Sequence, residues 1–401
     1  MIDAAARGLD VACALLALPA LVATGYLAAL AVLARRSAPP GPPAPRLRFD
    51  VVVPAHDEEA TIAETVRSLL AVDYPRSLYR VLVVADNCRD RTAEVAERAG
   101  ARVLARRDDA HRGKGHALAY AFDRALADGF AEAVVVVDAD SVADPNLLGA
   151  FAARFAGGAR AVQARYGVRN PAASWRTGLM ALALGLFHVE RSMARERLGL
   201  SCGLRGNGMG FTCDLLREAP HRACSIVEDM EYGVTLGRAG HRVQYVDEAR
   251  VLGEMPSTGA AARSQRRRWE GGRFALARTQ VPELLRLAVK KRDPLLLDLA
   301  MELIVPPLAY LSFVCLAGTV WSGLALGYGV GGRPAFVMWT ASLACLLVYV
   351  ARGWALSGVG ARGLVGLACA PFYLLWKASM LFERARPAHD EWVRTSREAR
   401  P

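Results

Sequence analysis

Between residues 49 and 138, short apolar runs alternate with stretches in which apolar residues recur at helical spacing. Helices are predicted between the runs, because Ile62, Val66 and Leu69 share one helical face and residues 117–127 are rich in alanine. Strands are predicted at residues 49–53, 81–85, 102–105 and 134–138. Strands that alternate with helices in this way predict an α/β domain.

The last apolar run contains four consecutive valines and ends in Asp138 and Asp140. An uninterrupted apolar run predicts a strand buried on both faces, as the parallel strands of an α/β sheet are. Residues two apart in an extended chain point to the same side, so both carboxylates can meet at the ligand-binding edge of the sheet. Oxygen ligands of this kind suit Mg²⁺ or Mn²⁺. The alternative is that the two aspartates only end the strand, since aspartate favours turns.

Longer apolar stretches predict membrane spans at both ends of the chain. Residues 11–34 carry no charge, and their length is sufficient to cross a bilayer. A signal peptide is the alternative, but the stretch is too long and no basic excess precedes it. Further spans are predicted within residues 303–332 and 334–351, whereas residues 363–376 fit a re-entrant, interfacial or tilted segment.

Basic residues predict the orientation of these spans. Arg35 and Arg36 follow the first span, and further arginines lie in the tail, so the positive-inside rule places the α/β domain and the tail in the cytoplasm and the amino terminus outside. Residues 172–198 are mostly apolar but contain charged side chains, which predicts a helix at the membrane surface. The predicted segments are an anchor (1–36), a Pro-rich linker (37–48), the α/β domain (49–279), an interfacial helix (280–298), a transmembrane region (299–383) and a basic tail (384–401).

Composition agrees with a membrane protein that acts on anionic substrates. The 401 residues are 53% hydrophobic and carry a formal net charge of +11. Nucleic acid is the competing partner for a basic chain, but neither a Cys/His finger nor an RNP-like aromatic strand occurs. The eight cysteines are scattered without a C-x-x-C pair, which excludes a disulfide framework or a zinc site and fits reduced cytosolic thiols.

Three further groups of residues suggest a nucleotide and phosphate site. Asp86 follows the second strand and can accept a hydrogen bond from a pyrimidine ring N–H, whereas Asp90 is expected to cap the next helix. Lys114 lies in a Gly-flanked basic loop before a helix, where backbone amides and the helix dipole favour a phosphate. Gln265, Arg268 and Trp269 share a helical face, which combines an amide, a phosphate fork and an aromatic plate. The alternative for this face is an interfacial basic helix.

A pair of carboxylates at residues 228 and 229 offers a proton acceptor. Ser225 and Glu228 have the spacing of a capping box, which explains Glu228 without chemistry. Asp229 has no such explanation. A carboxylate at a helix start near a cation stays ionised, so Asp229 is predicted to act as a general base.

The order of these motifs resembles the family 2 glycosyltransferases, and most closely the membrane-embedded group of cellulose, chitin and hyaluronan synthases and exopolysaccharide glycosyltransferases. The resemblance covers roughly residues 49–278. It implies a glycosyltransferase A-type, Rossmann-like mixed-sheet α/β domain with N- and C-terminal transmembrane helices. The motifs are Val53-Pro-Ala-His-Asp-Glu58, Ala85-Asp-Asn-Cys88, Arg112-Gly-Lys-Gly115, Asp138-Ala-Asp140, Glu228-Asp229 and Gln265-Arg-Arg-Arg-Trp269.

The resemblance also implies roles for single residues. Asp86 would contact uracil, Asp138 the nucleotide and Asp140 the metal, with Asp138 as a second metal ligand. Asp229 would be the general base, and Gly206-Asn-Gly208 departs from the commonest form of the acceptor loop. The residues implied to bind the nucleotide sugar are Pro54, Ala55, Glu58, Asp86, Lys114, Asp138, Asp140 and Arg268. Those implied to bind the acceptor are Gly206, Asn207, Gly208, Gln265 and Trp269.

The implied activity is inverting transfer from a UDP-sugar, dependent on Mg²⁺ or Mn²⁺, at the cytoplasmic face of the cell membrane. The acceptor stays open between a growing polysaccharide and a single addition to a lipid-linked sugar or glycolipid. Expected partners besides the substrates are membrane lipids and an export partner or a second copy of the chain, but no nucleic acid. The rival function is an inactive, membrane-tethered nucleotide-sugar sensor.

Overall fold

A computed structural model describes residues 2–36, 47–361, 363 and 367 of the chain. The strands are β1 (Phe49–Ala55), β2 (Tyr79–Asp86), β3 (Arg102–Arg106), β4 (Ala133–Val136), β5 (Ser141–Ala143), β6 (Ala161–Val168), β7 (Met209–Thr212) and β8 (Val243–Gly253). The helices are α1 (Ile2–Leu33), α2 (Ile62–Leu70), α3 (Thr92–Arg98), α4 (Lys114–Asp128), α5 (Leu147–Ala156), α6 (Trp175–Leu184), α7 (Arg191–Arg197), α8 (Cys213–Glu218), α9 (Glu228–Arg238), α10 (Gly259–Lys291), α11 (Pro294–Ile304), α12 (Leu308–Gly327) and α13 (Arg333–Ser357). Short 3₁₀ and π turns occur at Arg76–Leu78 and Gly185–Glu190.

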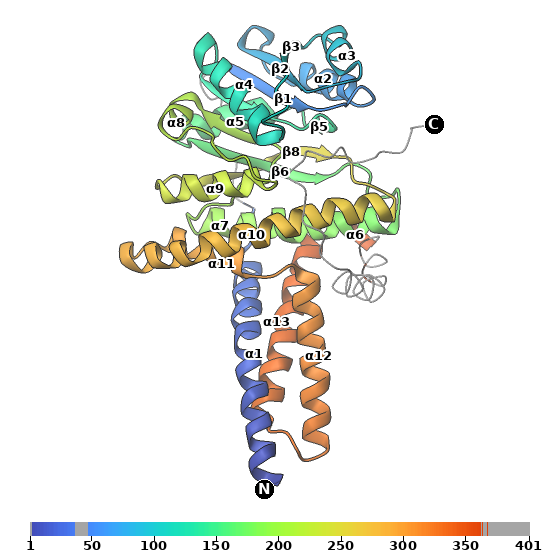
Figure 1. Ribbon diagram of the computed structural model, residues 1–401, viewed down its shortest axis with the longest axis vertical. Coiled ribbons are helices and arrows are strands. Elements are labelled where there is room, and N and C mark those ends of the chain that lie inside the picture. The colour runs from blue at the N-terminus through green and yellow to red at the C-terminus, as the bar shows by residue number, and fades with distance from the viewer. Residues whose placement is uncertain (1, 37–46, 362, 364–366, 368–401) are drawn as a thin grey trace.

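Within the described chain these elements form three tiers (Figure 1): a sheet domain, a layer of helices that includes α6, α7, α10 and α11, and a stalk of α1, α12 and α13. The sheet has the order β3-β2-β1-β4-β7-β6-β8-β5. Strands β3, β2, β1 and β4 are parallel, and β7 runs antiparallel to both β4 and β6. This mixed α/β sheet confirms the predicted fold class.

The predicted strands are the four parallel ones, β1 to β4, and all four form. Alternate residues of β1 face opposite sides of the sheet, so Val51 packs in the same cluster as Ile62 of α2 while Val52 packs with Leu118 of α4. Residues 133–136 are fully buried, as the run of valines predicts for a strand covered on both faces. Two of the later strands lack the pattern of a buried strand. β8 is only half-buried, and β7 is short and contains Gly210.

The layer between sheet and stalk contains the segment 172–198, predicted as one helix at the membrane surface. It forms α6, the π turn and α7 as a run of consecutive helical residues. Helix α10 joins the basic helix after residue 259 to the first part of the expected interfacial helix at 280–298, and it ends at the basic residues Lys290 and Lys291. The rest of that predicted helix belongs to α11, because the chain turns at Arg292, which has left-handed backbone angles, and restarts a helix after Asp293. The position of residues 280–298 at a membrane interface stays a prediction.

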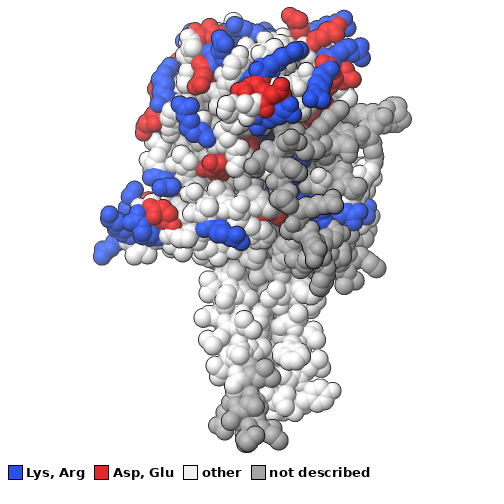
Figure 2. All heavy atoms as spheres, viewed as in Figure 1, with Lys and Arg blue, Asp and Glu red and all other residues white. Residues whose placement is uncertain are grey.

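Three of the described helices are long and apolar enough to cross a membrane: Asp10–Leu33, Leu308–Gly327 and Arg333–Ser357. They match the predicted spans, and Figure 2 shows neither blue nor red spheres over most of the visible stalk. Large apolar side chains such as Leu16, Trp321 and Leu347 are 71%, 59% and 63% exposed on its surface, which suits contact with lipid rather than water. Residues 37–46 of the predicted linker (37–48), most of segment 363–376 and the tail at 384–401 lie outside the described residues.

A buried ion network ties the helical layer to the stalk. Arg195 of α7 is fully buried, with its Nε 2.8 Å from Asp298 Oδ2 and a second ion pair to Glu302, both on α11. Tyr26 of α1 donates to Asp298 at 2.7 Å and accepts from Arg195 at 2.7 Å. Breaking a buried pair costs about 3–5 kcal/mol, because it leaves an uncompensated charge. The network therefore couples the orientation of α1 to that of α7 and α11.

Candidate active site

A cavity of about 580 Å³ lies between the carboxyl edge of the sheet, the helical layer and the stalk. It brings together most of the predicted motifs, which are far apart in the sequence, and it continues to the first turn of α12. Its lining includes Pro54, Glu58, Lys114, Asp138 and Asp140 from the sheet edge, Gly206, Glu228 and Asp229 beside them, Gln265, Arg268 and Trp269 on α10, and Leu308, Ser312 and Val350 on the stalk.

The two aspartates after β4 are held in place by a buried asparagine. Asn207 Oδ1 accepts the N–H of Asp138 at 3.1 Å, and its amide donates to Ser141 Oγ at 2.7 Å. The Ser141 hydroxyl in turn donates to Asp140 Oδ1 at 3.0 Å. Asn207 is fully buried, and its side chain supports this turn through these hydrogen bonds. The acceptor role assigned to Gly206, Asn207 and Gly208 stays a prediction.

The Lys114 side chain lies between the carboxylates of Asp138 and Glu228 and does not extend into solvent. Its Nζ lies 2.5 Å from Asp138 Oδ1 and 3.6 Å from Glu228 Oε1, and it donates to the carbonyl of Gly206 at 2.7 Å. Burial opposes the charge, but these carboxylates, helped by Asp229, hold the pKa of Lys114 above its ordinary value. Gly206 has a φ of +77°, and a Cβ there would come within 3.4 Å of both Lys114 and Asp229, so glycine allows this close approach.

The predicted capping box at Ser225 and Glu228 is wrong. Helix α9 begins at Glu228, and the Ser225 N–H donates to Glu231. Glu228 instead turns toward Lys114 and is only 7% exposed. Burial raises the pKa of Glu228 to about 7 and raises the pKa of Asp229, with Lys114 opposing both shifts. Two adjacent carboxyl groups with raised pKa values beside a cation are candidates for proton transfer.

Asp86 lies outside the cavity lining, at the end of β2. Its Oδ1 accepts from Arg106 at 2.6 Å, whereas Oδ2 is buried with no hydrogen-bond partner among the described residues. Burial raises its pKa, and Arg106 opposes that shift. An orphaned buried carboxylate oxygen can accept a ring N–H, so the geometry is compatible with the predicted base contact.

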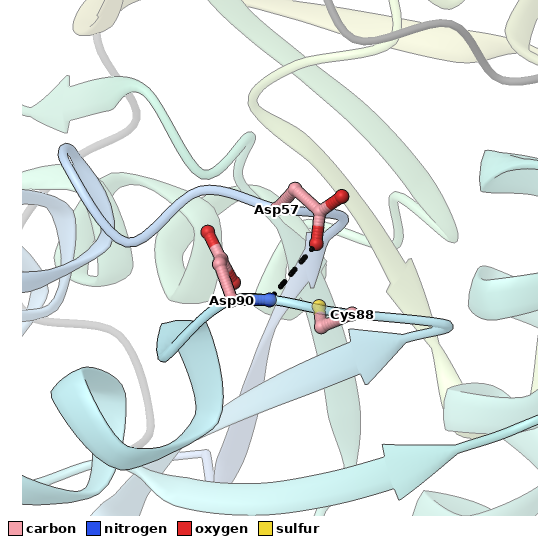
Figure 3. A group of neighbouring side chains, drawn as sticks. All are labelled: Asp57, Cys88 and Asp90. Carbon is pink, nitrogen blue, oxygen red and sulfur yellow. Dashed lines mark hydrogen bonds between the residues drawn. The ribbon is translucent and has the colours of Figure 1, made fainter.

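Figure 3 shows a second group of possible metal ligands, Asp57, Cys88 and Asp90, whose ligand atoms lie within 4.8 Å of one another. Their hydrogen bonds join two loops: Asp57 Oδ1 accepts from the N–H groups of Arg89 and Asp90, and Asp90 accepts from the N–H groups of Glu59 and Thr92. Asp90 thus binds the first N–H of α3, but the N-cap residue of that helix is Arg91 and not Asp90 as predicted. Burial raises the pKa of Cys88 to about 11, so the thiol stays protonated. This group therefore holds loops together.

Asp138 and Asp140 are better suited to hold a divalent cation than the loop group of Asp57, Cys88 and Asp90. Both supply carboxylate oxygens to the cavity at the carboxyl edge of the sheet, which is the hard donor set that Mg²⁺ and Mn²⁺ prefer. Across the cavity, α10 presents Gln265, Arg268 and Trp269, as the helical spacing predicts. Burial lowers the pKa of Arg268, and Trp269 is 37% exposed.

Sequence reasoning missed the arginines at the lower end of the cavity. Arg191, Arg205 and Arg273 line it together with Phe187. Arg205 directly precedes the glycine loop and interacts electrostatically with Asp229. Adjacency to that loop was the only signal for Arg205. Nothing in the local pattern marked the other two, since they lie within helices.

The comparisons with known proteins agree with this site. The chain matches the family described as glycosyltransferase like family 2 over residues 45–272. The probable glycosyltransferase YdaM of Bacillus subtilis (strain 168) is 22% identical over 264 residues, 63% of this chain and 60% of that protein. Beta-monoglucosyldiacylglycerol synthase of Synechocystis sp. is 29% identical over 232 residues, 55% of this chain and 47% of that protein. The chain thus spans about half to three fifths of the length of these relatives.

A solved structure shares the fold over most of the chain. The mannosyltransferase PcManGT from Pyrobaculum calidifontis, in complex with GDP-Man and Mn²⁺, is 19% identical with a TM-score of 0.53, and the match covers 88% of this chain and 99% of that one. The fold is therefore that of a glycosyltransferase A-type domain with helices at both ends. Since the family match extends over more than half of its residues, the chain belongs to glycosyltransferase family 2.

Proposed function

We propose that the protein is an inverting, membrane-bound glycosyltransferase that moves a sugar from a UDP-sugar to a lipid-borne acceptor. The observation that carries this proposal is the continuity of the cavity, which reaches from Asp138 and Asp229 to Leu308 and Val350 on the transmembrane candidates α12 and α13. An acceptor with its head group near the carboxylates can keep an apolar chain against the stalk. The relative from Synechocystis sp. is named for synthesis of a glucosyldiacylglycerol, which agrees with such an acceptor.

The proposed chemistry is one displacement. Asp229 takes the proton of the acceptor hydroxyl, the oxygen forms a bond to the anomeric carbon, and the bond from that carbon to the diphosphate breaks. The configuration inverts because no covalent sugar intermediate forms. Lys114 and Arg268 stabilise the negative charge of the departing UDP. A divalent cation held by Asp138 and Asp140 would supply further charge neutralisation at the diphosphate.

The donor end of the cavity supports a nucleotide sugar. Pro54, His56 and Glu58 line it next to the aspartates after β4. Asp86 adjoins this region because His56 Nδ1 lies 2.7 Å from the Asp86 carbonyl oxygen. The predicted roles of Pro54, Ala55 and Glu58 in binding the sugar nucleotide belong to the same proposal.

A turnover assay tests the function. The full chain in lipid bilayers is incubated with a panel of UDP- and GDP-sugars, and release of the nucleoside diphosphate and formation of a glycosylated lipid are measured. We expect both products with at least one UDP-sugar. Binding of UDP-sugars without any turnover would favour the sensor, and turnover with GDP-sugars alone would overturn the proposed donor.

We expect Trp269→Ala to raise the acceptor KM about three- to tenfold with little change in the donor KM, because the ring offers an apolar face to a sugar. Trp269→Phe should have a smaller effect. Trp175→Ala is the matched control, since Trp175 is also 37% exposed but does not line the cavity. Unchanged acceptor kinetics together with weaker membrane association would favour an interfacial anchor instead.

We further propose that the sheet domain is cytoplasmic and the amino terminus outside. Figure 1 places the end of α1, the start of α12 and the end of α13 at the side of the stalk that faces the sheet domain, which suits three spans with this orientation. We expect protease added to right-side-out vesicles to leave the sheet domain intact. Digestion of the domain from outside would contradict both this topology and the use of a cytosolic donor.

A further inference from the structure

Three arginines surround one aromatic ring at the lower end of the cavity. The guanidinium carbons of Arg205, Arg191 and Arg273 lie 4.4, 4.8 and 5.8 Å from the centre of the Phe187 ring. They come from separate elements: the loop before β7, the start of α7 and the middle of α10. All three line the cavity together with Phe187, so their charges converge on one part of it.

Arg191 keeps a donor that nothing in the described structure uses. It is 3% exposed, and its Nε donates to the Tyr349 hydroxyl at 2.8 Å, but Nη1 is buried with no hydrogen-bond partner among the described residues. Arg205 donates to Glu302 Oε1 at 3.0 Å and to a carbonyl at 2.7 Å. Arg273 is bound to the carbonyl oxygens of Glu302 and Val305. A buried guanidinium donor without a partner is costly, which points to a ligand that accepts from it.

Two carboxyl groups near the cluster are shared or have a raised pKa. Glu302 is shared between Arg195 and Arg205, and burial raises the pKa of Glu190 to about 8 despite Arg191 beside it. Burial and the neighbouring arginines together lower the pKa of Arg205 to about 10 and that of Arg273 to about 9. Burial is the larger cause of both shifts, so an anion placed among these desolvated guanidinium groups would stabilise their charge.

We infer that this arginine cluster binds a phosphate group carried by the lipid acceptor. The inference rests on the proposed function and specifies the acceptor class within it. Phosphate suits the site because guanidinium groups donate to its oxygens in pairs. The cavity wall continues from Phe187 through Leu186 to Leu308 and Val350, so an acyl or prenyl chain attached to the phosphate has an apolar path to the stalk. Arg205 links the cluster to Asp229, which places the acceptor head group near the base.

A binding assay with matched lipids tests the inference. The full chain in detergent micelles is mixed with dioleoyl phosphatidate or with dioleoylglycerol, which lacks only the phosphate, and the lipid-bound fraction is measured by native mass spectrometry. We expect phosphatidate to bind about tenfold more tightly, as for a charge-assisted phosphate contact. Arg191→Gln should remove most of this preference, and Arg191→Lys should keep part of it because the charge remains.

Two controls test whether phosphatidate binds at the arginine cluster. One excludes attraction by exposed positive charges elsewhere on the chain, and the other excludes binding at the donor site. The double variant K290Q/K291Q removes exposed charges at the end of α10 and should keep the preference for phosphatidate. UDP binding should be unchanged in R191Q, which also shows that the variant is folded. A loss of preference in K290Q/K291Q but not in R191Q would overturn the inference. Displacement of phosphatidate by UDP, or by inorganic phosphate at equal concentration, would also overturn it, because the phosphate would then belong to the donor or need no lipid.

Failure of the inference can be told from failure of the proposed function. If the wild-type chain and R191Q transfer sugar equally well to dioleoylphosphatidylglycerol, which carries a phosphate and free hydroxyl groups, and to dioleoylglycerol, the phosphate subsite is wrong and the transferase stands. If no sugar donor is turned over while the phosphatidate preference still depends on Arg191, the subsite stands and the transferase proposal fails.

Discussion

Asp229→Asn is expected to lower sugar transfer by roughly 10²- to 10⁴-fold, because the amide keeps the size of the side chain but cannot take a proton. The carboxylate lies in the cavity beside Lys114 and Gly206, and its Oδ1 accepts the N–H of Met230 at 2.8 Å. Binding of UDP should change little. Initial rates of UDP release and equilibrium binding of UDP, measured on the same preparation, check both parts.

Glu228→Gln is the matched control in the adjacent position, and its expected effect is smaller. Removing this charge lets Asp229 ionise more easily, so the rate should fall only modestly and the acid limb of the pH profile should move to lower pH. In the wild type, burial raises the pKa of Glu228 to about 7 and also raises the pKa of Asp229, so protonation at low pH should lower the rate and the rate should rise with pH. A larger loss at Glu228 than at Asp229 would move the base to Glu228. Two mild effects would leave the transferase without a proton acceptor.

Asp140→Asn is expected to reduce transfer roughly 10²-fold or more, and chelation with EDTA should have the same effect on the wild type, because charge on the leaving diphosphate would be left without neutralisation. Mn²⁺-dependent binding of UDP, measured by calorimetry, should weaken in parallel. Asp144→Asn serves as the control, since Asp144 lies four residues further on and pairs with Arg250 at 2.9 Å instead of lining the cavity.

Two outcomes would contradict the metal assignment. Full turnover in EDTA would show that Asp138 and Asp140 only terminate β4. A Mn²⁺ requirement that changes in Asp57→Ala but not in Asp140→Asn would move the site to the loop group of Figure 3. Asp57 already accepts the N–H of Arg89 at 2.7 Å, so we expect its loss to loosen the two loops instead.

The hydrophobic pattern determined those elements whose burial is uniform along the chain. The valines of β4 predict a strand covered on both faces, and the uncharged run of α1 predicts a membrane span, because each pattern follows from the surroundings of consecutive residues. The motif residues Asp138, Asp229 and Trp269 were also found from the sequence, since their order along the chain is specific. That they line one cavity is seen only in the tertiary structure.

Only the tertiary structure decided what the ambiguous residues do. The spacing of Ser225 and Glu228 fits a capping box, yet Lys114, which is distant in sequence, draws Glu228 into the site, and α9 starts later than the spacing suggests. Nothing in the sequence indicates that Asn207 supports the aspartates after β4; the antiparallel pairing of β7 with β4 brings it beside them, where it accepts the N–H of Asp138.

The arginines around Phe187 show the same limit most clearly. Arg191, Arg205 and Arg273 lie in segments with no common pattern, and they meet because the helical layer packs between the sheet and the stalk. The local sequence shows the periodicity of apolar residues, and this pattern indicates which residues of one helix or strand are buried. Which charged side chains share one buried volume depends on contacts between distant segments, and so the fold alone decides which charges of this site lie together.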